Sequence, residues 1–325
     1  MRRFILLNTR SSPGTHMSSH DTMHRTITRD GHAIAYTVHG DPHGVPVVVL
    51  HGGPGSGSQP GALRLFDLAR VRVVMVDQRG TGASTPRGSL RHNDTQRLIR
   101  DLEAIRVQLG IVRWGVVGGS WGAALALAYA GTHPASVSGV VLRGLFLTSE
   151  REVRRLFVTS RFRAQREWRA LMRAARCERA SSLPSACMRS MRSQTRGRAD
   201  AVAAAWRAYE NAVLMHKTAV HKRTSSKHDE ATTAKYRIQA RYLVHGCWLG
   251  ERRLIALAKR AVAAGVAVHA VHGSRDPVCP PDNLHRLMRA VPAVHGRFVD
   301  AGHLASDPRL AEALVAAIRE AFGAC

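Results

Sequence analysis

Hydrophobic and polar positions alternate along this chain in two different ways. Short apolar runs of the length of a buried strand recur at 34–38, 45–50, 71–76, 114–117, 137–142, 266–271 and 297–299. Stretches with helical spacing of apolar residues lie between several of them, at 94–109, 123–132, 254–264, 283–290 and 308–321. Alternating strands and helices are typical of an α/β protein whose mostly parallel sheet is covered on both faces. Any active site is then expected above the carboxyl ends of the strands.

The alternation stops between residues 148 and 250. Residues 151–198 carry 14 arginines against three acids, in a helical pattern over 150–177 that continues over 200–217. Polar residues at 221–233 predict a loop. We therefore expect a helical cap at 148–250, inserted between the two parts of one core, 24–147 and 251–325. The polar residues before 24 predict a disordered N-terminal extension over 1–23.

A serine lies at the junction between a predicted strand and a predicted helix. Gly118-Gly119-Ser120-Trp121-Gly122 follows the apolar run at 114–117 and precedes an alanine-rich helical stretch. A Gly-x-Ser-x-Gly turn of this kind exposes the serine hydroxyl above the sheet, and the glycines let neighbouring backbone approach closely. The amino end of the following helix also favours negative charge. Ser120 is the candidate nucleophile.

Two later loops supply a candidate acid and a candidate base. Asp276 follows the apolar run at 266–271, and His303 follows the run at 297–299 in a Gly-His loop. The order Ser, acid, His is that of the α/β-hydrolase fold. Serine needs a base within hydrogen-bond reach, and the base needs a carboxylate that fixes its tautomer. Asp276 is favoured over Asp300, which lies only three residues before His303 and would end the same strand.

The loop after the strand at 45–50 predicts an oxyanion hole. It reads His51-Gly52-Gly53-Pro54-Gly55 and occupies the position that supplies a backbone N–H donor in this fold. Gly53 is favoured over Gly52 as that donor, and the N–H of Trp121 is the second. His51 is interpreted as a structural loop residue.

These motifs together resemble those of the proline iminopeptidases, which are serine peptidases of the α/β-hydrolase fold. The resemblance lies in the loops at 51–55, 77–86 (Asp-Gln-Arg-Gly-Thr-Gly-Ala-Ser-Thr-Pro) and 118–122, and more weakly at 93–110 and 129–134. It implies removal of N-terminal proline from small peptides, without a metal or an organic cofactor. It also implies that the helical insertion is a cap over the active site.

The resemblance places recognition of the substrate's free amine on two cap glutamates. Glu210 matches the first of them, in Trp206-Arg207-Ala208-Tyr209-Glu210. At the second position this chain has Gln239, which accepts a hydrogen bond but supplies no countercharge. Loss of a charge-assisted bond weakens ammonium binding by about 1–3 kcal/mol. The structural alternative is that Glu210 only caps or pairs with Arg207 on one helical face.

Charge and cysteine content limit the partners and the cellular compartment that the sequence favours. The formal net charge is +25, but only five of the 48 basic residues are lysine, and no zinc finger, recognition helix or aromatic-basic motif is present. Specific nucleic-acid binding is therefore not favoured. Five dispersed cysteines are typical of free thiols in a reducing cytoplasm. No apolar run approaches the ~20 residues that span a membrane.

Two other functions stay open. An esterase or amide hydrolase of the same fold, acting on another small acyl substrate, would be indifferent to a free amine. A basic nucleic-acid-associated or scaffold protein with a vestigial site would bind in a salt-sensitive way without serine reactivity. The sequence does not determine the oligomeric state.

Overall fold

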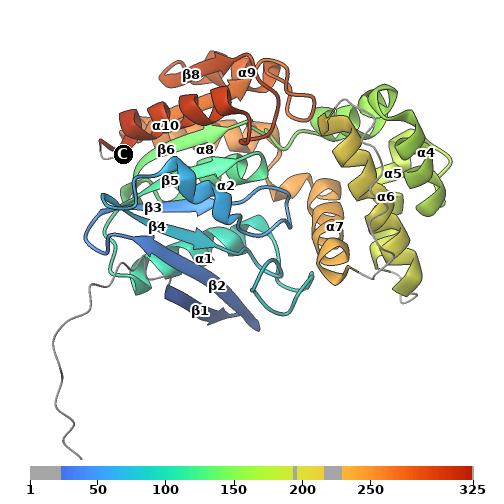
Figure 1. The fold of residues 1–325 in the computed structure, drawn as a ribbon, viewed down its shortest axis with the longest axis horizontal. Coiled ribbons are helices and arrows are strands. Elements are labelled where there is room, and N and C mark those ends of the chain that lie inside the picture. The colour runs from blue at the N-terminus through green and yellow to red at the C-terminus, as the bar shows by residue number, and fades with distance from the viewer. Residues whose placement is uncertain (1–22, 193–195, 216–228, 324–325) are drawn as a thin grey trace, which may run out of the picture.

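The computed structural model describes residues 23–192, 196–215 and 229–323. Its centre is an eight-stranded sheet with the order β1-β2-β4-β3-β5-β6-β7-β8 (Figure 1). The strands are β1 (Met23–Arg29), β2 (His32–Gly40), β3 (Val45–Leu50), β4 (Val71–Val76), β5 (Trp114–Gly119), β6 (Val137–Arg143), β7 (Ala267–Gly273) and β8 (Val294–Val299). The pairs β1–β2 and β2–β4 are antiparallel, and all other pairs are parallel. The predicted α/β-hydrolase fold with a mostly parallel sheet is confirmed.

The first strand was not predicted. β1 lies at the sheet edge, and its polar sequence MHRTITR lacks the apolar run that marked the others. It pairs with β2 through Asp30 and Gly31, whose φ angles are 50° and 77°. An Asp-Gly pair with two positive φ angles is the preferred two-residue hairpin turn, and this was the available signal. Of the predicted disordered extension, Met23 begins β1, and residues 1–22 lie outside the described residues.

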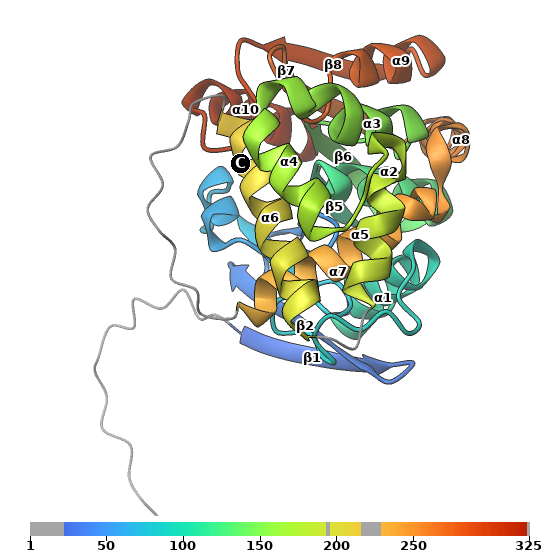
Figure 2. The same cartoon turned by 90° about the vertical axis from the view of Figure 1, so that its right-hand side faces the viewer.

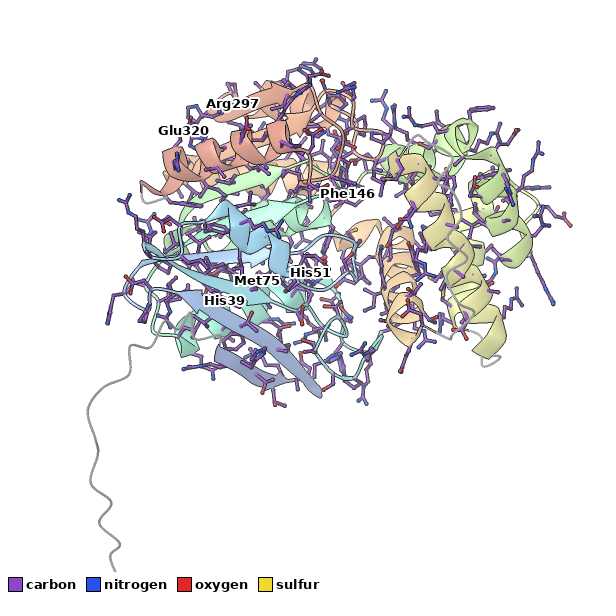
Figure 3. All side chains as sticks on the ribbon, viewed as in Figure 1. His39, His51, Met75, Phe146, Arg297 and Glu320 are labelled. Atoms are coloured by element: carbon purple, nitrogen blue, oxygen red, sulfur yellow. The ribbon has the colours of Figure 1, made fainter. Side chains whose placement is uncertain are left out.

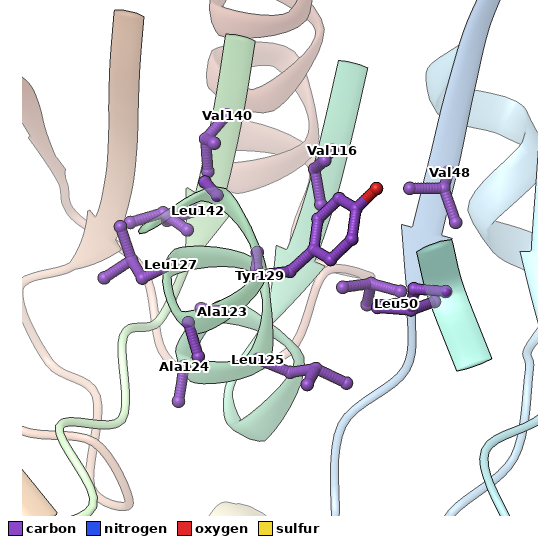
Figure 4. Close-up of a cluster of buried hydrophobic side chains, with 14 of the residues drawn as sticks. Val48, Leu50, Val116, Ala123, Ala124, Leu125, Leu127, Tyr129, Val140 and Leu142 are labelled. Atoms are coloured by element: carbon purple, nitrogen blue, oxygen red, sulfur yellow. The ribbon is translucent and has the colours of Figure 1, made fainter. Parts of the chain in front are cut away.

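One face of the sheet carries most of the helices. They are α1 (Thr95–Gln108), α2 (Trp121–Thr132), α8 (Gly250–Ala263) and α9 (Asp282–Ala290). Helix α2 is buried along almost its whole length because it lies between the sheet and α8. Leu125, Leu127 and Tyr129 of α2 belong to the main hydrophobic cluster with Val116 and Val140 of the sheet (Figure 4). This packing fixes the position of the turn from which α2 starts.

The opposite face is covered more thinly. A smaller hydrophobic cluster joins the sheet to α10 (Pro308–Phe322) and to the segment after β3. That segment forms only a six-residue 3₁₀ helix, η1 (Pro60–Leu65). Short 3₁₀ turns η2 (Pro134–Ser136) and η6 (Gly246–Trp248) connect other elements.

Within the described ranges, five α-helices lie between β6 and α8 and form a layer over the strand ends (Figure 2). They are α3 (Glu150–Arg154), α4 (Gln165–Ala174), α5 (Leu183–Met191), α6 (Arg196–Met215) and α7 (Glu230–Val244). The layer has its own hydrophobic cluster around Trp206, while Ile238 and Tyr242 of α7 pack into the main core. We call α3–α7 the helical layer.

Two local expectations for this layer were wrong. The helical pattern over 150–177 is interrupted by a π turn, η3 (Arg155–Thr159), and a 3₁₀ turn, η4 (Ser160–Arg163). The loop expected over 221–233 is helical from Glu230 onward, because Asp229 caps α7 by accepting the N–H of Thr232. Residues 221–228 lie outside the described residues.

Candidate active site

Ser120 lies on a sharp turn between β5 and α2. Its φ and ψ are 57° and −119°, a conformation that a non-glycine residue adopts only under strain, and its N–H donates to Arg143 O at 2.8 Å. A Cβ atom on Gly118 would lie 2.2 Å from Gly122 O, and one on Gly122 would lie 2.1 Å from Leu50 O. The glycines of the motif are therefore needed for close backbone approach.

The structure brings His303 and Asp276 together from the loops after β8 and β7. His303 Nδ1 lies 2.6 Å from Asp276 Oδ2. Asp276 Oδ1 accepts the N–H groups of Val278 and Cys279, both at 2.9 Å. Burial raises the pKa of Asp276, but the adjacent His303 and these hydrogen bonds outweigh burial, so its pKa is lowered overall. An ionised Asp276 makes Nδ1 the protonated nitrogen and leaves Nε2 as the acceptor.

Ser120 is not hydrogen-bonded to His303 in this conformation. The nearest polar side-chain partner of its Oγ in the described part of the chain is Cys279 Sγ, at 3.9 Å. Ser120 and His303 nevertheless line the same cavity. The geometry therefore supplies an oriented base and a serine hydroxyl that line one cavity.

Asp300, the alternative acid, is not near this site. Its side chain is 65% exposed and forms ion pairs with Arg275 and Arg309 at 2.6 and 3.0 Å. These contacts leave it on the surface. Among the two candidate acids, Asp276 alone contacts His303 in the structure.

Arg143, at the end of β6, is a site residue that sequence reasoning missed. Its Nη1 donates to His303 O at 2.7 Å and lies 3.4 Å from His303 Nε2. Since Arg143 O also accepts the N–H of Ser120, one residue connects the serine turn to the histidine loop. Burial lowers the pKa of this guanidinium, although the charge of Asp276 opposes the effect. One arginine among so many gave no signal in the sequence.

The loop after β3 approaches the serine turn from the other side. A Cβ atom on Gly52 would lie 3.5 Å from Ser120 Cβ and 3.2 Å from Gly119 O. The N–H groups of Gly53 and Trp121 make no hydrogen bond to a protein acceptor within the described ranges. Two unpaired donors beside a serine can stabilise an oxyanion. The arrangement is compatible with the predicted pair.

The Asp-Gln-Arg-Gly loop after β4 is hydrogen-bonded to this glycine loop. His51 is buried, and its Nε2 accepts the N–H of Gln78 at 3.1 Å, while Gln78 Nε2 donates to His51 O at 3.0 Å. Trp121 Nε1 donates to Gln78 Oε1 at 2.8 Å. Arg79 is held by a two-bonded ion pair with Asp101, at 2.6 and 2.7 Å. His51 thus occupies a structural position, in line with its interpretation from the sequence.

The helical layer contributes Glu210 and Gln239 to the same cavity. Four side chains donate to the Glu210 carboxylate. Oε1 accepts Trp206 Nε1 at 3.0 Å and Gln239 Nε2 at 2.5 Å; Oε2 accepts Tyr236 OH at 2.8 Å and Lys235 Nζ at 3.4 Å. A carboxylate has about four acceptor sites, so these donors fill it.

Gln239 retains a free acceptor. Its Nε2 must face the Glu210 carboxylate, since only the amide NH₂ can donate, and its Oε1 then has no partner among the described residues although it is buried. Arg207 pairs with Asp229 at 3.0 Å and makes no ion pair with Glu210. The structural alternative for Glu210 is therefore wrong in its partner: the cation beside Glu210 is Lys235.

One cavity of about 1180 Å³ joins these groups. Its lining includes Ser120 and His303 on the core side and Glu210 and Gln239 on the helical-layer side. Besides Glu210, its acidic lining residues in the described ranges are Glu152, saturated by hydrogen bonds from Leu147, Ser149 and Asn283, and Glu312 on α10. Of these acidic lining residues, Glu210 is the one that is hydrogen-bonded to Gln239, whose Oε1 is a free buried acceptor.

No group of three His, Cys, Asp or Glu residues with the geometry of a metal site occurs in the described part of the chain. The four cysteines that the structure describes, Cys177, Cys187, Cys247 and Cys279, are free thiols. Among the described helices, none has the length and apolarity to span a bilayer.

Comparison with known proteins identifies the family. A sequence profile of the α/β hydrolase fold matches residues 45–309. The chain is 37% identical over 291 residues to a proline iminopeptidase of Xylella fastidiosa (strain 9a5c), covering 89% of this chain and 92% of the relative. It is 35% identical over 294 residues to a proline iminopeptidase of Arabidopsis thaliana, covering 89% and 76%. The chain belongs to the proline iminopeptidase family.

Solved structures support the fold of this proline iminopeptidase family member. A thioesterase domain from the curacin biosynthetic pathway matches with a TM-score of 0.58 at 19% identity, over 92% of this chain and 99% of that one. The 2-hydroxy-6-oxo-6-phenylhexa-2,4-dienoate hydrolase of Rhodococcus sp. strain RHA1 matches with a TM-score of 0.57 at 18% identity, over 93% and 99%. At such identities these matches establish the fold alone.

Proposed function

We propose that this protein is a serine aminopeptidase that releases N-terminal proline from small peptides. The observation that carries the proposal is the single cavity in which a strained serine, an oriented histidine and the partly buried carboxylate of Glu210 meet. The names of relatives that match nine-tenths of the chain support the same activity. The dispersed free thiols favour a cytoplasmic location.

The proposed reaction proceeds through an acyl-enzyme. Ser120 Oγ attacks the carbonyl carbon of the N-terminal prolyl residue while His303 Nε2 takes its proton. The N–H groups of Gly53 and Trp121 hold the oxyanion, and each such donor contributes about 3–4 kcal/mol to transition-state stabilisation. The C–N bond then breaks, and the leaving amine takes the proton from His303. Water then attacks the prolyl ester while His303 takes a proton from it. The ester C–O bond breaks, His303 returns the proton to Ser120 Oγ, and free proline leaves.

The free amine of the substrate is the group that distinguishes this activity from other acyl transfer. In the proposed complex, Gln239 Oε1 accepts one ammonium N–H, because it lines the cavity beside Glu210 and is a buried acceptor without a partner among the described residues. Glu210 supplies the countercharge, but it shares that charge with Lys235. Prolyl substrates should therefore bind weakly, since the pocket's charge is already balanced in part.

A second candidate function is hydrolysis of another small ester or amide. The hydrogen bonds around Glu210 favour this second function. Because protein donors already saturate the carboxylate, the pocket would bind a neutral substrate as well as a cationic one. Nucleic-acid association is supported by net charge alone.

Active-site labelling tests the proposed mechanism. A fluorophosphonate should label one serine stoichiometrically, at Ser120, and prior reaction should abolish hydrolysis of a prolyl amide. EDTA should have no effect on the rate. Labelling at another residue, or activity lost on chelation and restored by a divalent ion, would contradict the mechanism.

A further inference from the structure

The cavity does not end at the catalytic residues. Beyond Ser120 it continues between η1 and α10, over the thinly covered face of the sheet. We call this part the η1–α10 slot; it is lined by Ala62, Leu65, Met75, Leu304, Ala311 and Val315. Figure 3 shows Met75 on the sheet and Phe146 toward the helical layer, and both residues line the same cavity. The cavity therefore has one compartment on each side of the serine.

The slot exists because of a local feature of the chain. The six-residue η1 and α10 are the helical elements that contact each other on this face within the described ranges, and small side chains line the space between them. The cavity exceeds the roughly 300–1,000 Å³ that enclose a drug-sized ligand. An N-terminal prolyl group beside Glu210 would fill only a part of it.

The position of the slot relative to His303 determines which part of a substrate it faces. His303 Nε2 must reach the leaving nitrogen, because it protonates that atom when the C–N bond breaks. The slot begins at Leu304, the next residue after His303. The acyl side, in contrast, is toward Glu210 and Gln239 in the helical layer. The slot therefore lies on the side of the leaving group.

The walls of the slot are apolar near the serine and charged at the far end. Arg64 of η1 and Arg319 of α10 line the cavity, are exposed, and form no ion pair with any described residue. Glu312 on the same wall offsets one of the two charges. Residues 311–319 of α10 span about 12 Å at 1.5 Å per residue. An extended peptide of three to four residues, at ~3.3 Å each, has the same length.

We propose that the η1–α10 slot binds the leaving part of the peptide: an apolar residue directly after the N-terminal proline, and a free carboxylate, two to three residues further on, near Arg64 and Arg319. This rests on the proposed aminopeptidase function. It assigns short peptides with an apolar second residue as the preferred substrate class.

Filling the slot tests the proposal. Prolinamide has no leaving chain, so the ratio of kcat/KM for Pro-Leu-Gly-Gly, whose carboxylate lies two residues beyond the leucine, to that for prolinamide isolates the slot. We expect Ala311→Phe and, independently, Ala62→Phe to lower this ratio at least tenfold and to leave prolinamide turnover unchanged. Ala263→Phe, on an exposed position of α8, is the matched control and should not change the ratio. An unchanged ratio in both slot variants would overturn the proposal.

Charge and side-chain preference give two further readouts. The wild type should prefer Pro-Leu-Gly-Gly over Pro-Asp-Gly-Gly, and also over the C-terminal amide of Pro-Leu-Gly-Gly. The double variant Arg64→Glu with Arg319→Glu should abolish the preference for the free carboxylate over the amide. Arg252→Glu on α8 is the charge control. If prolyl substrates are cleaved without these preferences, the slot assignment fails while the aminopeptidase function stands.

Failure of the function itself has a different signature. It would appear as hydrolysis of p-nitrophenyl esters with none of prolinamide. A preference for long acyl esters that Ala311→Phe removes would place an acyl chain in the slot, and would overturn the leaving-side assignment.

Discussion

Two carboxylates serve the same cavity, buried Asp276 and partly buried Glu210, and their surroundings differ. Asp276, from the core, is held by two backbone N–H groups and gives its other oxygen to His303. Glu210, from the helical layer, is held entirely by side chains, one of them a lysine. Backbone donors come with the fold, whereas side-chain donors change by single substitutions. We therefore expect single substitutions to change the hydrogen-bond donors to Glu210 readily, and those to Asp276 much less.

The largest effect is expected where the core side is broken outright. Ser120→Ala and His303→Ala should each lower kcat by about 10⁴- to 10⁶-fold, and the double variant should be little worse, because the nucleophile and its base act as a unit. Steady-state kinetics on a prolyl amide measure this. If the fold-loss in kcat of the double variant equals the product of the two single losses, the two residues act separately.

Asp276→Asn should have the next largest effect. The amide leaves the geometry in place but removes the charge that fixes the His303 tautomer, so kcat should fall by about 10⁴-fold. In the wild type, the pKa of Asp276 is lowered in the folded state. The ionised carboxylate therefore stabilises the fold above the pKa of the unfolded chain, and this stabilisation is lost as the pH falls through the folded-state pKa. Asp276→Asn should therefore flatten the acid limb of the stability curve, measured by urea unfolding between pH 3 and 7. An acid limb identical to wild type would argue against a charged Asp276.

On the layer side, Glu210→Gln should lower kcat/KM for prolyl substrates by about 10- to 100-fold, because an ammonium bound at Gln239 loses its countercharge, a change of ~1.5–3 kcal/mol. Turnover of a neutral ester should stay near the wild-type value, since the core residues are unchanged. Equal losses on both substrates would mean that Glu210 maintains the structure of the pocket and does not recognise the amine.

The smallest expected effects are gains. Lys235→Met should remove the cation that shares the Glu210 charge, and Gln239→Glu should add a second countercharge; each should lower KM for prolyl amides about three- to tenfold. Arg207→Met, whose partner is Asp229, is the matched control and should leave KM unchanged. A raised KM in Lys235→Met would show that Lys235 orders Glu210 and does not compete with the substrate.

The same contrast explains what the sequence revealed. Ser120, Asp276 and His303 each follow an apolar strand, so their loops meet at one edge of the parallel sheet and could be found from local patterns. Arg143 and Lys235 could not, because their roles depend on contacts with residues 160 and 25 positions away. The edge strand β1 was not predicted from the sequence, because an exposed strand lacks the apolar run of a buried one.

The η1–α10 slot was also invisible in the sequence. A space between elements is set by how α10 packs on the sheet, and no local pattern of Ala62 or Ala311 marks it. The helical layer gave a clear helical pattern, yet arginine-rich segments without glycine or proline did not show the break at η3 and η4.

The most direct test compares a prolyl amide with its N-acetylated counterpart on the wild-type protein. Acetylation removes the positive charge of the amine and leaves the scissile bond intact. We expect kcat/KM for the free amine to be higher by at least tenfold, even with Lys235 beside Glu210. Equal kcat/KM for both substrates would contradict the aminopeptidase function and favour a hydrolase of neutral acyl substrates.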